Sequence, residues 1–287
     1  MAQLDVFHAL DRGLAAAVAA AAPSVVHVSR GHAGGTGIAW SEDLVVTSNF
    51  HTPDRTKVGI GTADGNLDQR DAEVIGRDPG TDVALVRVTG AGLTAAKLRD
   101  LDGLAVGNLA LAIGRPGRTA RASLRAIGVL GPEVETPHGG KLDRYVESDR
   151  QIPRGFAGGP LVDVDGAVIG MNTRTLLRGA DLAIPVATLR RVVDELKAHG
   201  GIRRGYLGVG AYPTGQGALV ASLEDGGPAA AAGILIGDIL VEVDGEAVSG
   251  PDSLRSVLAS RPGKQVKIAL VRGGQRQEVE VTLGSQS

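Results

Sequence analysis

The first two hundred residues alternate between short apolar runs and turns rich in Gly, Pro, Asp and Asn, a pattern typical of short β-strands. In the first part of this region, strands are predicted at 24–29, 38–40, 44–47, 58–61, 72–76 and 83–88. After a less regular stretch, a second set is predicted at 109–114, 122–130, 144–148 and 164–172. The glycine-rich residues 31–37 are expected to be a turn-rich link. Two successive β units of this kind indicate a pair of small barrels.

Two stretches have the spacing of an amphipathic helix instead. In residues 1–22 the positions that carry this spacing are Leu4, Phe7, His8, Leu10 and Leu14. The Ala-rich part of this stretch resembles a signal-peptide core, but Asp5, Asp11 and the lack of a basic start favour a helix. The compartment is therefore undetermined, and a cytoplasmic location is expected unless a leader was removed. A second helix is expected at 187–198, ended by Gly200.

The remaining residues are expected to form a compact α+β module with its own core. It combines strands at 217–223 and 239–243 with a helix at 251–260 and a closing hairpin at 266–283. The chain then divides into an N-terminal helix (1–22), a β region (23–200) and the final module (201–287). The predicted fold class is mostly β.

Composition narrows the function classes. The chain has 287 residues, is 43% hydrophobic and 22% charged, and has a formal net charge of −2, so it is globular and carries no basic block for nucleic acid. It has no Cys, which excludes disulfides, thiolate metal sites and a cysteine nucleophile. The six His residues are scattered, so neither a zinc site nor any other cofactor is expected. No apolar run is long enough to span a membrane.

A glycine-rich stretch at residues 154–163 is the strongest candidate for chemistry. Gly155 and the pair Gly158-Gly159 allow a tight turn that aims successive N–H groups into one space. Such a nest binds a negatively charged oxygen, as acyl transfer requires. The nucleophile would lie beside it, at the position that Ala157 occupies. A plain glycine turn explains the stretch equally well when it is taken alone.

His51, Asp82 and Ala157 follow one another in the order base, acid and nucleophile position. The first two fall in the first β unit and the third in the second, so a site would form between the barrels. Singly, His51 could be a structural hydrogen-bonding residue and Asp82 the cap of the turn before it. Their joint occurrence, in order and on two β units, favours an inherited catalytic triad.

Several motifs together resemble the chymotrypsin-fold serine proteases of the HtrA/Deg type. They are Ser48-Asn49-Phe50-His51, Asp78-Pro79-Gly80-Thr81-Asp82, Gly155-Phe156-Ala157-Gly158-Gly159-Pro160, Gly170-Met171-Asn172-Thr173 and Leu182-Ala183-Ile184-Pro185. The resemblance implies a double β-barrel that cleaves unfolded or exposed polypeptide. It also implies His51 as base, Asp82 as its orienting acid, and the N–H groups of Gly155 and position 157 as oxyanion donors.

The tail, from residue 204 to the closing hairpin, resembles the PDZ domain of the same family. The resemblance implies a peptide-binding site at Tyr206, Leu207, Gly208 and Val209, in which the N–H groups of the last three receive the C-terminal carboxylate of a peptide. The alternative is a module that only packs on the protease or regulates it. Relatives often form trimers through N-terminal segments, so the first helix could assemble a homotrimer. Packing of this helix on the barrels is favoured over assembly.

The chain departs from the family pattern at the nucleophile. Ala157 has no oxygen, so it forms no acyl-enzyme, and losing a triad serine removes about six orders of magnitude in rate. Phe156 stands where relatives have Asn, which main-chain oxyanion donors tolerate, and Arg154 stands for the usual Pro. A deliberate Ser→Ala knock-out and a natural loss of activity fit equally well. A non-enzymatic protein that holds peptides in its PDZ groove and inactive cleft remains the alternative, and a metal-dependent hydrolase is disfavoured.

Overall fold

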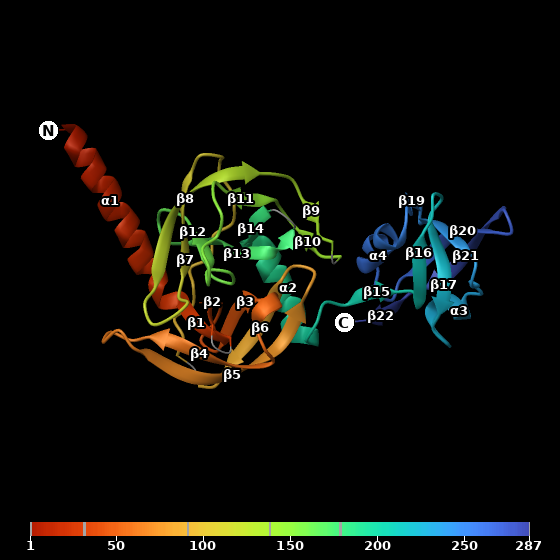
Figure 1. The fold of residues 1–287 in the computed structure, drawn as a ribbon, viewed down its shortest axis with the longest axis horizontal. Coiled ribbons are helices and arrows are strands. Elements are labelled where there is room, and N and C mark those ends of the chain that lie inside the picture. The colour runs from red at the N-terminus through yellow and green to blue at the C-terminus, as the bar shows by residue number, and fades with distance from the viewer. Residues whose placement is uncertain (1, 31–32, 91, 138, 178–179, 287) are drawn as a thin grey trace. The chain divides into compact units, whose positions relative to one another are not determined.

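The computed structural model describes residues 2–30, 33–90, 92–137, 139–177 and 180–286. These residues form two compact units, 1–200 and 201–287. The first unit contains two closed barrels, drawn in red to orange and in yellow to green in Figure 1, and the second is a smaller α+β unit drawn in cyan to blue. The predicted fold class, a chymotrypsin-like double barrel followed by a PDZ-like domain, is confirmed.

The first barrel has the strand order β1-β2-β3-β6-β5-β4 and closes through antiparallel pairing of β1 with β4. Its strands are β1 (Val25–Arg30), β2 (Ala33–Ala39), β3 (Leu44–Ser48), β4 (Arg55–Gly61), β5 (Leu67–Asp78) and β6 (Val83–Val88). Alternate apolar side chains point inward, and Val28, Val45, Val58 and Val86 at the centre of the core are fully buried. The short 3-10 helix Asn49–His51 follows β3 directly.

The second barrel has the order β11-β14-β13-β12-β7-β8. Its strands are β7 (Leu109–Gly114), β8 (Arg121–Leu130), β11 (Val146–Ser148), β12 (Pro160–Val162), β13 (Val168–Leu177) and β14 (Ala180–Pro185). A two-stranded sheet, β9 (Val134–Glu135) with β10 (Lys141–Leu142), interrupts it. Helix α2 (Val186–His199) buries its apolar face, and Gly200 ends it in the left-handed conformation, as predicted.

The expected link at 31–37 is wrong where the structure describes it, because residues 33–37 belong to β2; residues 31–32 lie outside the described part. Glycines weaken a strand, but here they permit close approach of neighbouring groups. A Cβ at Gly34 would lie 1.9 Å from the carbonyl oxygen of Pro116, and one at Gly37 would lie 2.5 Å from Val45 Cγ1. Close packing, rather than turn formation, explains these glycines.

Helix α1 (Ala2–Ala21) forms as predicted, but its amphipathic stripe does not pack as expected. Phe7 is 64% exposed and Leu10 is 45% exposed, whereas Ala17 and Ala21 are buried. The helix is held at its C-terminal end, where a Cβ at Gly166 in the β12–β13 turn would lie 2.6 Å from the Ala17 oxygen. Small alanines allow this close contact; the larger apolar side chains lie beyond it.

The second unit contains a sheet of order β16-β17-β18-β20-β21, with β19 beside β18, and a separate pair of β15 with β22. The strands are β15 (Arg204–Tyr206), β16 (Val209–Pro213), β17 (Ala218–Leu223), β18 (Ile239–Val243), β19 (Glu246–Ala247), β20 (Gln265–Arg272), β21 (Gln275–Thr282) and β22 (Gly284–Gln286). Helices α3 (Pro228–Ala231) and α4 (Pro251–Ala259) complete the unit. Its core includes Leu207, Leu240, Leu254, Leu258 and Ile268.

The buried carboxylate of Asp238 is expected to make the stability of this unit sensitive to acid. Asp238 is 2% exposed and accepts hydrogen bonds from Arg272 Nε at 2.8 Å and Nη2 at 2.6 Å. These bonds hold its pKa below the ordinary value of 3.8. A carboxylate whose pKa is lower in the folded than in the unfolded state stabilises the fold. This stabilisation is complete above the unfolded-state pKa and is lost as the pH falls through the folded-state pKa.

Asp238→Ala should therefore destabilise this unit by about 2 kcal/mol near neutral pH, and the difference from the parent should shrink below about pH 4. Urea unfolding across this pH range measures both effects. The control is Asp252→Ala, because that carboxylate is 93% exposed and its pair with Arg255 contributes little. Equal losses in the two variants would contradict the prediction.

Candidate functional site

Asp82 is the most constrained residue of the predicted triad. It is fully buried and has a φ of 57°, an uncommon value for a residue other than glycine. Ser48 Oγ donates to its two carboxylate oxygens at 3.0 and 2.9 Å, and the Phe50 N–H donates to Oδ1 at 2.9 Å. From the second barrel, Thr173 Oγ1 and Thr175 Oγ1 donate to Oδ2 at 2.6 and 3.2 Å. Hydrogen bonds thus fix this carboxylate from both barrels.

The main chain around His51 is held on both sides. Before it, the N–H groups of Asn49 and Phe50 donate to the main chain and side chain of Asp82. After it, Arg77 donates to the Thr52 carbonyl at 2.7 Å, and the same guanidinium reaches Asn49 Oδ1 at 2.9 Å. The side chain of His51 lies outside the described part of the structure. Its main chain is nevertheless described and forms the last residue of the 3-10 helix Asn49–His51. Phe50, the residue before it, donates its N–H to Asp82.

The predicted oxyanion donors lie on a tight turn. Gly155 has a φ of 82°, and the Phe156 N–H donates to the Pro153 carbonyl at 3.1 Å, which closes the turn. Within the described residues, the N–H groups of Gly155 and Ala157 donate no hydrogen bond. Thr36 Oγ1 in the first barrel donates to the Gly155 carbonyl at 2.6 Å. Two main-chain donors are therefore available on a turn that is anchored across the barrels.

Asn172 holds the other end of this turn from β13. Its carbonyl accepts the Gly158 N–H at 2.8 Å, and its own N–H donates to the Gly159 carbonyl at 2.8 Å. Its Nδ2 group donates to the carbonyls of Gly159 and Pro160 at 3.0 and 2.9 Å. The half-buried methyl of Ala157 therefore sits on a main chain that is held on both sides.

Gly158 is where the turn meets the first barrel. A Cβ there would lie 2.4 Å from the Thr36 carbonyl oxygen, 2.6 Å from Thr47 Oγ1 and 2.8 Å from the Ser48 N–H nitrogen. Ser48 in turn bonds Asp82, so these contacts bring the loop of Ala157 beside the segment that carries the acid. Gly158 also has a φ of 83°, which a side chain rarely adopts.

Gly158→Ala is expected to destabilise the first unit by about 3 kcal/mol, since it combines backbone strain with overlap against main-chain atoms. Gly65→Ala is the matched control, because Gly65 has a φ of 78° and nothing within 4 Å of a Cβ. That variant should lose only about 1 kcal/mol, for the conformation alone. Denaturant unfolding compares the two, and similar losses would mean that the barrels are not in close contact at Gly158.

Two charged groups hold the approach to the turn. Arg125 is 2% exposed and donates to the carbonyls of Arg150 and Gln151 at 3.1 and 2.9 Å. Burial lowers its pKa, and its Nε is the buried side-chain atom without a partner among the described residues. Asp181 Oδ2 accepts the Ile152 N–H at 2.6 Å. The segment before the turn is thus fixed by polar contacts.

The two departures from the family pattern beside the predicted nucleophile position, Phe156 and Arg154, have different environments. Phe156 is 4% exposed and belongs to the core of the second barrel, and its ring would overlap a Cβ at Gly114. It therefore packs inward and leaves the main-chain donors free. Arg154 is exposed, and the structure gives no account of its presence.

The PDZ-like unit contains a groove of about 570 Å³. Strand β16 is at an edge of its sheet, so one side of it is open for pairing with a peptide strand. Helix α4 forms the opposite wall, with Pro251, Leu254, Arg255 and Leu258 lining the groove. All four predicted peptide-binding positions line it, namely Tyr206, Leu207, Gly208 and Val209. In the part of the chain that is described, the Leu207 and Gly208 N–H groups donate no hydrogen bond.

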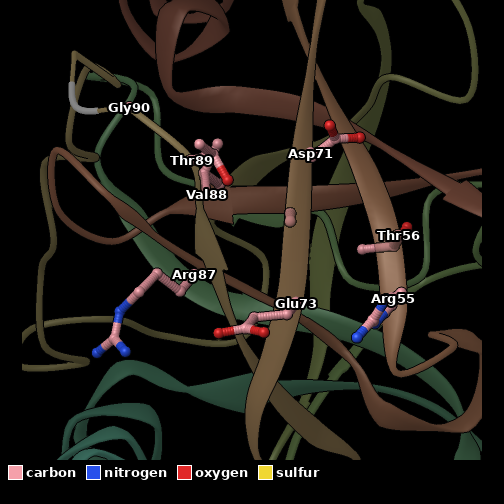
Figure 2. Close-up of a pocket in the computed structure, with 9 residues that line it drawn as sticks. Arg55, Thr56, Asp71, Glu73, Arg87, Val88, Thr89 and Gly90 are labelled. Atoms are coloured by element: carbon pink, nitrogen blue, oxygen red, sulfur yellow. The ribbon is translucent and has the colours of Figure 1, made fainter.

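A further hollow of about 610 Å³ lies on the first barrel and contains none of the predicted site residues. Figure 2 shows Glu73 of β5 between Arg55 of β4 and Arg87 of β6. Among the described residues, no group of three or more His, Asp and Glu is placed to bind a metal ion. None of the described helices is long and apolar enough to cross a membrane.

Sequence reasoning missed several residues that hold the site. Thr173 lies in a motif that was identified, but its hydrogen bond to Asp82 was not foreseen; Thr175 follows two residues later on the same face of β13. Thr36 and Arg77 carry no local signal, because each acts on a segment distant in sequence.

Two models of known protein families match this chain. The trypsin-like peptidase domain covers residues 35–171 and the PDZ domain covers residues 205–283. Two relatives are each described as a probable periplasmic serine endoprotease DegP-like. The protein from Halomonas elongata is 32% identical over 87% of this chain and 56% of its own length. The protein from Chlamydia muridarum is 32% identical over 87% of this chain and 53% of its own length. The chain thus spans about half the length of these relatives.

Solved structures give the same result. The HtrA-type protease AlgW with decapeptide is 25% identical, has a TM-score of 0.73, and the match covers 96% of this chain and 99% of that one. The serine endoprotease from Yersinia pestis is 27% identical with a TM-score of 0.73, covering 96% of this chain and 98% of that one.

Proposed function

Since the chain is of the HtrA/DegP type, with a trypsin-like peptidase domain followed by a C-terminal PDZ domain, we propose that its barrels form the site of a serine endopeptidase for unfolded or exposed polypeptide. The reaction is blocked because Ala157 occupies the nucleophile position. The observation that carries the proposal is the Asp82 carboxylate. Both barrels donate hydrogen bonds to it, beside the main chain of His51 and close to the loop of Ala157.

Each remaining group has a defined task in acyl transfer. Asp82 holds the imidazole of His51 in the tautomer that accepts a proton and stabilises the imidazolium that forms. His51 takes the proton of an attacking hydroxyl and later gives it to the leaving amine. The N–H groups of Gly155 and Ala157, which donate no hydrogen bond within the described structure, stabilise the oxyanion of the tetrahedral intermediate.

The block is confined to the first bond-forming step. A methyl group at position 157 has no lone pair to attack the carbonyl and no proton to give to His51. The oxyanion donors are main-chain groups and do not depend on that side chain. The chain as written therefore binds polypeptide in the cleft without forming an acyl-enzyme.

Covalent labelling tests the proposal directly. Ala157→Ser should become labelled by a fluorophosphonate at position 157, as located by peptide mass spectrometry, while the parent chain should not. The control Ala157→Ser with His51→Ala should be labelled far more slowly, because the hydroxyl then has no base. A folded Ala157→Ser variant that stays unlabelled would overturn the endopeptidase proposal.

The second candidate is a non-enzymatic protein that holds peptides or client proteins. The alanine at position 157 favours it, together with a PDZ groove whose carboxylate-binding N–H groups need no serine. The codon in the natural gene separates the two: serine there supports a protease, and alanine supports a binding protein.

A further inference from the structure

The direction of a bound peptide follows from the ends of the PDZ groove. At one end, a Cβ at Gly205 would lie 2.2 Å from the Leu258 carbonyl, so the end of α4 adjoins the loop with the Leu207 and Gly208 N–H groups. At the other end, a Cβ at Gly250 would lie 3.7 Å from Pro213 Cβ. A peptide with its carboxylate on the loop therefore runs antiparallel to β16, from the Pro213 end toward the loop.

The spacing of α4 matches alternate residues of that peptide. Two residues of a strand advance by about 6.7 Å, and four residues of a helix advance by about 6 Å. The last peptide side chain therefore lies beside Leu258, and the side chain two residues earlier lies beside Leu254 and Arg255. The terminal end is apolar, because Leu207 and Leu258 line the groove there.

The charged side chains that line the groove are basic, namely Arg204 and Arg255. One carboxylate lies beside the loop end: Glu224 accepts a hydrogen bond from the Tyr206 hydroxyl, and its Oε2 would lie 3.4 Å from a Cβ at Gly208. Arg255 pairs with Asp252 at 3.6 Å, but the two side chains are 61% and 93% exposed. An exposed pair of this kind is weak and exchanges readily with another carboxylate. Arg255 is thus available to a ligand carboxylate that is partly shielded from water between α4 and β16.

We propose that the groove selects C-terminal peptides with an apolar last residue and an Asp or Glu two residues before it. This inference rests on the proposed use of the groove for peptide binding and adds the specificity. The carboxylate side chain pairs with Arg255 on the wall of the groove formed by α4.

Fluorescence anisotropy with the full chain tests the inference. The probes are labelled eight-residue peptides that end in Val and differ in one residue, Glu, Gln or Lys, two positions before the end. The Glu peptide should bind about fivefold tighter than the Gln peptide at low salt, corresponding to about 1 kcal/mol for a partly exposed pair. High salt should reduce this difference.

Arg255→Glu should abolish the preference and favour the Lys peptide. The matched control is Lys267→Glu, which makes the same charge change on β20, separated from β16 by two strands of the sheet. This control should retain the preference for Glu. Equal binding of the three peptides would overturn the inference while leaving the groove a peptide site. If the Val peptides bind no better than their C-terminally amidated forms, the proposed use of the groove itself fails.

Discussion

Ala157→Ser should raise the rate of casein cleavage by about six orders of magnitude over the parent chain, because a triad without its serine retains only binding and oxyanion effects. The structure supports a large gain. The turn that carries position 157 is already anchored by Asn172 and by Thr36, so the new hydroxyl enters a preformed site. Release of fluorescent peptides from labelled, unfolded casein measures the rate.

Ala157→Gly is the control for this gain, because it changes the same position without supplying an oxygen. It should remain as inactive as the parent. If the Ala157→Ser variant folds with unchanged thermal unfolding and yet releases no peptides, this result would show that the site lacks the base or the oxyanion donors. The protease hypothesis would then give way to the binding protein.

Asp82→Asn, introduced together with Ala157→Ser, should lower that rate by about four orders of magnitude. The carboxylate accepts hydrogen bonds and donates none, whereas an amide presents an NH2 group that cannot accept from Phe50 N–H or from the threonine hydroxyls. In the proposed triad, the imidazole of His51 then loses the partner that sets its tautomer. Steady-state casein cleavage and fluorophosphonate labelling should fall together.

Thr175→Val is the matched control for Asp82→Asn. Its hydroxyl makes the longest of the bonds to the carboxylate, at 3.2 Å, and the other donors remain. The rate should fall by about tenfold or less, as expected for one lost hydrogen bond. If Asp82→Asn lowered the rate no more than Thr175→Val, Asp82 would only be a structural residue.

Local pattern was sufficient for most of the fold, because strand and helix signals depend on neighbouring residues. Alternating apolar runs predicted the barrel strands, and the apolar spacing at 187–198 predicted α2 to within a residue or so at each end. The pattern failed at β2, where glycines that suggested a turn instead permit contact with Pro116 and Val45. It predicted the helix α1 correctly but not its packing, because Phe7 and Leu10 remain exposed.

The sequence by itself determined which chemical groups the site can contain: the order of His51, Asp82 and the glycine turn, and the missing oxygen at Ala157. Only the tertiary structure decided which residues hold those groups. Thr173 of the second barrel donates to Asp82 of the first, and Gly158 contacts Thr36 and Ser48. Folding brings these segments together, although Thr36 and Gly158 are more than a hundred residues apart in the sequence. Such contacts leave no periodic trace in a sequence, since they depend on three-dimensional packing rather than on neighbouring residues.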